Sequence, residues 1–143
     1  KVLWHEARIL LSAMVNGAAD GALEATVGYM STRVQFGRPL SANQAVRHAL
    51  ARMKLLQEAS AAAIQRVLLT NEYGQARDAQ STLAGSIAHA VWVLEKAIHL
   101  HGGMGFTWDV PLHYALREVR KLDAALGAGT LVRDLGREWI KAA

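Results

Sequence analysis

The stretch that decides the fold is residues 76–101, ARDAQSTLAGSIAHAVWVLEKAIHLH. Its large apolar side chains recur every three or four residues, a spacing that puts them on one face of an α-helix. They are Leu83, Ile87, Val91, Leu94 and Ile98. The pattern predicts a long helix with a buried stripe, which other helices must cover.

The preceding sequence has the same period. It predicts a helix from about residue 2 to residue 34, with an apolar stripe of Leu3, Leu10, Met14, Ala18, Ala22 and Val27. A second helix is expected to follow Ser41, a good N-cap, and to run to about Tyr73, with Gly74 as its stop. The stripe of this second helix is Val46, Leu50, Met53, Ala61, Ile64 and Leu68.

Two shorter helices are expected at the end of the chain. Pro111 suits the first turn of a helix that reaches about Ala125, and Gly127 and Gly129 then break it. A last helix is marked by Leu131, Leu135 and Trp139. The sequence therefore predicts an all-α, antiparallel up-down bundle of the four-helix type, as a single domain over residues 1–143.

Composition narrows the possible functions. The 143 residues are 52% hydrophobic and 20% charged, with no Cys, which excludes disulfides, thiolate zinc sites and thiol nucleophiles. The net charge of +4 suits an anionic small ligand and is weak support for nucleic-acid binding. No apolar run reaches the roughly 18 residues of a membrane span.

The first residues, KVLWHEAR, are charged within the apolar run and do not resemble a secretion signal, so a cytoplasmic location is expected. Because the sequence does not start with Met, we expect a piece of a longer protein or a processed product.

No metal site is expected. A di-iron site in a bundle needs Glu-x-x-His pairs, and none of the Glu residues here has a His three positions later. His99 and His101 are two residues apart and would diverge on a helix.

Glycines interrupt the first predicted helix at Gly17, Gly21 and Gly28. Each costs a helix about 1 kcal/mol relative to Ala. The three positions indicate either close approach by another backbone or a ligand, or simple tolerance within a long helix.

The segment 33–39, RVQFGRP, is the first candidate binding element. Arg33 and Arg38 offer planar guanidinium groups that match phosphate oxygens, and Phe36 could pack on a planar ring. The alternative is a helix C-terminus whose Arg side chains answer the negative end of the helix dipole.

The segment 99–106, HLHGGMGF, is the second candidate. Its small residues leave backbone N–H groups uncovered, as in loops that cradle phosphates. It does not follow a predicted strand, which excludes a Rossmann fingerprint. The alternative is a plain connection between two helices.

The two motifs occur in this order with a long helix between them. This arrangement resembles the C-terminal α-helical domain of the acyl-CoA dehydrogenase family over essentially the whole chain. The resemblance implies an N-terminal helical domain and a middle β domain outside this chain. It also implies FAD as cofactor and oxidation of the Cα–Cβ bond of an acyl-CoA thioester in fatty-acid or lipid metabolism. The implied partners are an electron-transferring flavoprotein and further copies or paralogues of the chain, in a dimer or tetramer with FAD across the interface.

Matched by position, the resemblance implies that Arg33 reaches the FAD pyrophosphate of a neighbouring subunit. It implies that Phe36 lies beside that cofactor and that Gln44 lies near its adenosine half. Gly102 and Gly103 match the glycines under the pyrophosphate.

Two further positions follow from the resemblance. His99 stands where family members usually have Gln, and a neutral His still donates one hydrogen bond, with a shorter reach. Arg8 matches an Arg at the CoA side of the substrate pocket.

The usual catalytic Glu is absent. Its position falls on Leu126, or on Ala128 if two residues are inserted, and the minority position on the first helix is Ala7. Glu6 and Asp123 are weak substitutes, displaced by one residue and by one helical turn. The function is thus either that of an acyl-CoA dehydrogenase with a displaced base or that of a non-catalytic, FAD-binding subunit of a heteromeric one. A helical interaction module unrelated to flavins is a third possibility, and this segment alone is expected to be inactive.

Overall fold

The computed structural model describes residues 2–70, 76–127 and 129–142. The elements in chain order are α1 (Val2–Thr32), β1 (Val34–Gln35), β2 (Arg38–Pro39), the 3₁₀ helix η1 (Leu40–Ala42), α2 (Gln44–Thr70), α3 (Ala76–His101), the 3₁₀ helix η2 (Gly102–Phe106), α4 (Leu112–Ala125) and α5 (Thr130–Ala142). The predicted all-α class is confirmed.

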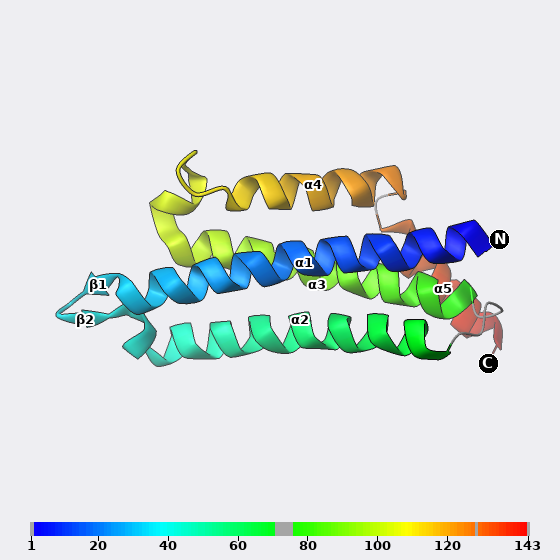
Figure 1. Ribbon diagram of the computed structural model, residues 1–143, viewed down its shortest axis with the longest axis horizontal. Helices are drawn as coiled ribbons and strands as arrows, with labels where there is room; N and C mark the ends of the chain where they lie inside the picture. The colour runs from blue at the N-terminus through cyan, green and yellow to red at the C-terminus, as the bar shows by residue number, and fades with distance from the viewer. Residues whose placement is uncertain (1, 71–75, 128, 143) are drawn as a thin grey trace.

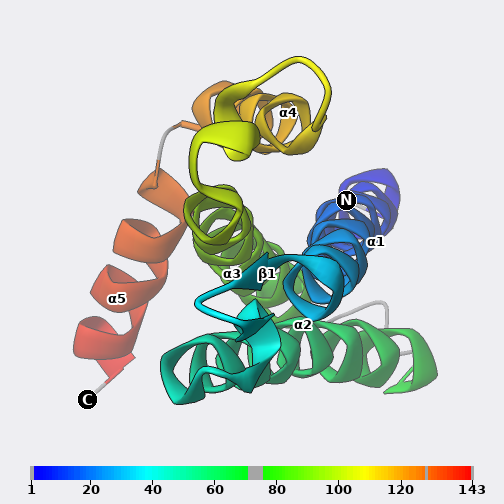
Figure 2. The ribbon, with the colours of Figure 1, turned by 90° about the vertical axis from the view of Figure 1, so that its left-hand side faces the viewer.

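Helices α1 to α4 run alternately up and down the long axis of the molecule (Figure 1). Helix α3 lies in the centre and packs against α1, α2, α4 and α5. The view along the bundle shows α5 at one side of the other helices (Figure 2). The chain therefore wraps four helices around one central apolar helix.

The central position of α3 follows from its sequence. The predicted stripe is confirmed at Leu83, Ile87, Leu94 and Ile98, which are buried, while Val91 is partly buried. Small residues between them are also buried and let the neighbouring helices approach closely; they are Ala79, Ala84, Ser86, Ala90 and Ala97. Burial on several faces explains why α3 is the element that the others cover.

The buried face of α1 differs from the prediction. Leu3, Leu10 and Met14 are exposed, Leu3 by 80%, and Val27 is exposed as well. The core side of α1 is instead formed by Ile9, Val15, Ala19, Ala22, Leu23 and Met30. Of the predicted stripe, Ala22 is buried and Ala18 is partly buried against the core. Because α1 is apolar on more than one face, spacing alone did not select the face that meets α3.

The second helix follows its prediction more closely. Met53 and Ile64 are buried and Val46 and Leu50 are partly buried, whereas Leu68 is exposed. Its start is two residues later than expected, because Ser41 lies in η1 and the carbonyl of Asn43 accepts the first helical bond, from Arg47 N–H. The predicted end at Tyr73 and Gly74 lies outside the described residues.

A hairpin that the sequence did not predict follows α1. The backbone N–H of Arg33 closes the last turn of the helix on the carbonyl of Tyr29. Strands β1 and β2 then pair in antiparallel register, with Val34 opposite Pro39. Phe36 and Gly37 form the tip with φ of 54° and 77°, the conformation of a tight type I′ hairpin turn.

The predicted breaks near the end of the chain are confirmed. Pro111 immediately precedes α4, and Gly127 and Gly129, with φ of 99° and 81°, separate α4 from α5. Among the described residues, none of the helices is sufficiently long and apolar to cross a membrane. In the same part of the chain, no group of three or more His, Asp or Glu side chains is arranged to hold a metal ion.

Because the buried face of α1 is not the predicted one, truncation of two methionines on this helix is expected to change the free energy of unfolding by different amounts. Met30 is 0% exposed and Met14 is 56% exposed. Met30→Ala is expected to lower the free energy of unfolding by about 2–5 kcal/mol, because it leaves a cavity. Met14→Ala is expected to change it by less than about 0.5 kcal/mol. Urea denaturation of the two variants measures both, and equal losses would contradict this assignment of faces.

A histidine between α2 and α3 predicts a pH-dependent stability. His89 Nδ1 lies 2.9 Å from Oγ of the buried Ser60, and burial lowers the pKa of His89 below its usual 6.5. Because the unfolded chain then binds the proton more tightly, the stability that His89 contributes is present above about pH 6.5 and is lost as the pH falls toward the lowered pKa. Urea denaturation between pH 7.5 and 5 is expected to show this loss in the wild type and a smaller one in His89→Gln. Identical pH profiles would contradict it.

Candidate functional site

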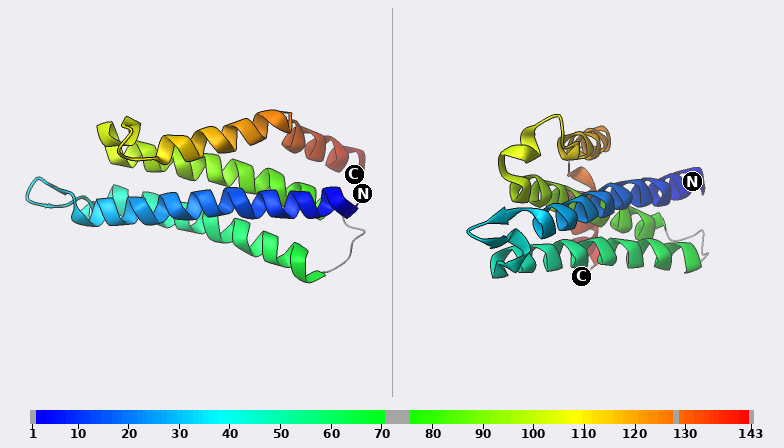
Figure 3. Two further views of the ribbon diagram at one scale, coloured as in Figure 1. Left: turned by 45° about the horizontal axis from the view of Figure 1, so that its top comes forward. Right: turned by 60° about the vertical axis from the view of Figure 1, so that its left-hand side comes forward.

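The fold brings the two candidate motifs to one end of the bundle. Helices α1 and α3 both end there, and the hairpin and η2 extend from their C-termini (Figures 1 and 3). The rings of Tyr29 in α1 and His101 in α3 stack with their centroids 4.5 Å apart. Segments that are about seventy residues apart in the sequence therefore leave the bundle side by side.

The hairpin presents an aromatic ring without cover from its own chain. Phe36 is 99% exposed and has a positive φ, which is uncommon for a residue other than Gly. The packing of this chain gives no reason for a bare phenyl ring at the tip of a strained turn. Strain and apolar exposure of this kind concentrate at binding sites.

The hairpin and the first half of α2 carry an excess of positive charge. Residues 25–57 contain five cationic side chains and no carboxylate; the cations are Arg33, Arg38, Arg47, Arg52 and Lys54. Lys54 is paired with Glu58 at 2.6 Å, and Arg52 lies over the ring of Trp92. Arg33 and Arg38 are exposed on the hairpin. An excess of positive charge at an exposed end attracts anionic ligands.

The glycine turn contains two kinds of glycine. A Cβ on Gly105 would lie 2.4 Å from the carbonyl oxygen of Ile98, so packing within the chain requires glycine there. A Cβ on Gly102 or Gly103 would meet no atom within 4 Å, and both residues are exposed. Gly102 also has a φ of 59°, which favours glycine. The turn thus exposes bare main chain to a second molecule, as the phosphate-binding interpretation requires.

His99 adjoins this turn. It is exposed on α3 and lines a pocket of about 440 Å³ together with Gly102 of the turn, Phe106 of η2 and Leu116 of α4. Gln44 begins α2 just after the hairpin and is also exposed. The predicted cofactor-binding residues therefore share one end of the bundle.

Arg8 is far from this group. It lies near the start of α1, about 37 Å along the helix axis from Arg33 at 1.5 Å per residue. Its guanidinium lies 5.8 Å from the centre of the Trp4 ring. The substrate-binding and cofactor-binding predictions thus fall at opposite ends of the bundle.

The predicted catalytic positions lie at the Arg8 end, where α1 begins and α4 ends (Figure 1). Leu126 caps α4 and packs against the core, and Ala7 is partly buried in α1; neither side chain can take a proton. Ala128, the alternative position, lies outside the described residues. Glu6 is exposed on α1.

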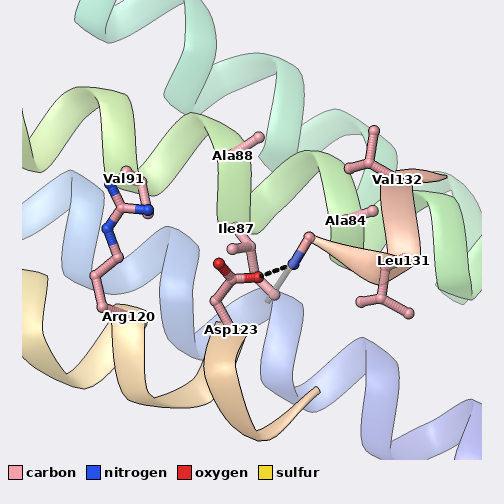
Figure 4. A pocket seen from close by; sticks show the side chains of 9 residues that line it. Ala84, Ile87, Ala88, Val91, Arg120, Asp123, Leu131 and Val132 are labelled. Carbon is pink, nitrogen blue, oxygen red and sulfur yellow. Dashed lines mark hydrogen bonds between the residues drawn. The ribbon is translucent and has the colours of Figure 1, made fainter. Parts of the chain in front are cut away.

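Asp123 has a structural partner. Its Oδ1 accepts a hydrogen bond from the backbone N–H of Gly129 at 3.2 Å (Figure 4). It lines a pocket of about 210 Å³ with Arg120 of α4 and with apolar side chains of α3 and α5. The carboxylate thus ties α4 to the start of α5, a role that nothing in the sequence pattern indicated.

The open glycine face of α1 was also undecided in the sequence. A Cβ on Gly17, Gly21 or Gly28 would meet no atom within 4 Å. Gly17 and Gly21 line a shallow pocket of about 260 Å³ together with Val110 and Pro111. Close approach by another part of this chain therefore does not explain the three glycines.

Comparison with known proteins gives one consistent result. The family model "Acyl-CoA dehydrogenase, C-terminal domain" matches residues 3–140. An acyl-CoA dehydrogenase of Bacillus subtilis is 31% identical over 128 residues, which cover 88% of this chain and 34% of that protein.

Solved structures agree. The "Tcur3481-Tcur3483 steroid ACAD", solved as a variant, superposes with a TM-score of 0.87 at 31% identity over 96% of this chain and 39% of that one. A chain from the structure entitled "Electron transferring flavoprotein of Acidaminococcus fermentans" superposes with a TM-score of 0.87 at 28% identity over 96% and 37%. The chain thus spans little more than a third of the length of these relatives.

The two kinds of glycine predict different effects of the same substitution. Gly105→Ala is expected to lower the free energy of unfolding by about 1–3 kcal/mol, because the new methyl group overlaps the Ile98 carbonyl. Gly103→Ala has open space and is expected to change stability by less than about 1 kcal/mol. Thermal and urea unfolding test the pair, and comparable losses would show that Gly103 is also a packing residue.

Proposed function

Because the chain belongs to the acyl-CoA dehydrogenase family and forms its C-terminal domain, we propose that it is the C-terminal helical domain of an FAD-dependent enzyme that oxidises the Cα–Cβ bond of an acyl-CoA thioester. The observation that carries the proposal is that the cationic hairpin and the bare glycine turn lie at the same end of the bundle. The proposal includes an N-terminal helical and a middle β domain outside this segment, as the family resemblance implies, and the chain spans little more than a third of the length of its relatives.

The residues present suit the cofactor. FAD carries an anionic diphosphate between two planar ring systems, and it supplies the hydride acceptor of the reaction when it is bound. Arg33 would bind diphosphate oxygens through its guanidinium, and the N–H groups around Gly102 and Gly103 would donate to them. Phe36 would cover an apolar ring face, and Gln44 and His99 would add polar contacts.

At the opposite end, Arg8 would bind the CoA side of the substrate through its guanidinium. The proposed partners are an electron-transferring flavoprotein and one or more further subunits in a dimer or tetramer, and the proposed location is the cytoplasm. The Acidaminococcus structure, whose title names such a flavoprotein, supports the electron acceptor.

A second candidate function follows from the missing base. Leu126 and Ala7 cannot accept a proton, Asp123 holds the Gly129 amide, and Glu6 is displaced by one residue. These facts favour a non-catalytic subunit that binds FAD while a paralogous chain supplies the carboxylate. The name Tcur3481-Tcur3483 joins two designations for one steroid dehydrogenase, which agrees with a two-chain enzyme.

The two candidates differ in one experiment. The full-length protein is purified, its flavin absorbance is recorded, and acyl-CoA is added without oxygen. Bleaching of the flavin by this protein alone supports the enzyme, whereas bound flavin that bleaches only with a co-expressed paralogue supports the non-catalytic subunit. Absence of flavin under every pairing contradicts both.

Arg33 supplies a sharper test of the cofactor site. Arg33→Ala in the full-length protein is expected to weaken FAD binding about 10- to 100-fold, because a charged hydrogen bond is worth about 1.5–3 kcal/mol. Arg66→Ala is the matched control, since Arg66 lies on α2 and is paired with Asp78 at 3.4 Å, away from the hairpin. The ratio of flavin to protein absorbance after dialysis measures the effect. Equal retention in the two variants would refute the role of Arg33.

A further inference from the structure

Two stacked rings join the two motifs. The rings of Tyr29 and His101 are 4.5 Å apart at an interplanar angle of 17°. His101 is buried and Tyr29 is partly buried. Stacked ring pairs of this kind contribute about 0.5–1.5 kcal/mol beyond the area that they bury.

The ring of His101 is held in place by its own helix. Its Nδ1 lies 2.9 Å from the carbonyl oxygen of Ala97, one turn earlier. Since a carbonyl oxygen only accepts, Nδ1 carries the hydrogen of this bond. The bond fixes the plane of the imidazole, so that one ring face remains against Tyr29.

Each ring lies at the helix end from which one motif extends: Tyr29 precedes the hairpin and His101 precedes the glycine turn. The carbonyl of Tyr29 accepts the N–H of Arg33, and the carbonyl of Arg33 accepts the N–H of Leu40 at the far side of the hairpin. His101 directly precedes Gly102, whose positive φ starts the glycine turn. The hairpin packs on α1, whereas η2 packs on α3 and α4. The stack therefore bridges two elements that rest on different helices.

We propose that Tyr29 and His101 are a positioning pair, which couples the hairpin at Arg33 to the turn at Gly102 and Gly103 so that both face one ligand in a fixed relation. Neither residue is assigned a contact with the ligand. The use of this coupling for FAD rests on the proposed function, whereas the coupling itself is a property of this chain. Two groups that bind one diphosphate together bind it best when their separation is set before binding.

The test substitutes one ring of the stack and measures hydrogen exchange in the motif that adjoins the other ring. The N–H of Leu40 reports on the hairpin and the N–H of Thr107, bonded to the carbonyl of Met104, reports on the glycine turn. His101→Leu is expected to accelerate hydrogen exchange at Leu40, and Tyr29→Leu at Thr107, by about three- to tenfold. Leucine keeps buried apolar volume, which protects the fold, and removes the stack.

Conservative and control variants separate coupling from general loosening. His101→Phe retains a ring and is expected to restore exchange at Leu40 to within about twofold of the wild type. The double variant is expected to add little to either single one, as residues that act through one contact do. Trp108→Leu is the control, because Trp108 is an exposed ring beside the turn and its partners are His113, Tyr114 and Arg117, not the stacked pair.

Faster exchange only on the mutated side, or equally throughout the core, overturns the inference, as does failure of the Phe variant to rescue. In the full-length protein, His101→Leu is further expected to lower flavin retention about three- to tenfold, with rescue by His101→Phe. Retention equal to that of the wild type would overturn the coupling as a feature of the cofactor site. If the wild type itself holds no flavin with any partner, the proposed function fails, and the exchange measurements alone decide the inference.

Discussion

The burial of α3 on nearly all sides is the constraint on which the rest of this structure depends. Its apolar and small residues face α1, α2, α4 and α5. Burial of apolar side chains at about 25 cal/mol per Å² favours any arrangement that covers this helix. Short connections then force the successive helices α1 to α4 to alternate in direction. The C-termini of α1 and α3 consequently meet at the same end, which is where the binding elements begin.

The two ends of the bundle have different chemistry. One end combines cationic side chains, a bare phenyl ring and unprotected main chain, and the described residues give these features no partner within the chain that would explain them. The opposite end holds the positions proposed for the catalytic base, where Glu6 is displaced by one residue and Asp123 is bonded to the Gly129 amide. The residues proposed to bind the cofactor and the positions proposed for proton abstraction therefore lie at opposite ends of the bundle. A chain can bind the cofactor while a second subunit supplies the base.

Helix α1 shows how far a periodic pattern can be used. Its sequence predicted a long helix correctly, because many residues contribute to that pattern. The choice of face failed, since Leu3, Leu10 and Met14 compete with Ile9, Val15 and Met30 on the opposite side. Helix α3, by contrast, was assigned correctly because its neighbours cover it on several faces, including the one with the predicted stripe. The error lies where a helix is apolar on two faces and only one of them meets this chain.

The sequence by itself determined the class of fold, the positions of the long helices and the two motifs that identify the family, because these depend on local spacing and on residue type. It also predicts that the family's usual base is missing, because the expected positions are occupied by Leu126 or Ala128 and by Ala7. Only the tertiary structure decided that Tyr29 stacks on His101, that Asp123 holds the Gly129 amide, and that Gly105 is required by packing whereas Gly103 is not. Each of these depends on atoms that meet only when the chain has folded, and spacing along the sequence carries no record of such distances.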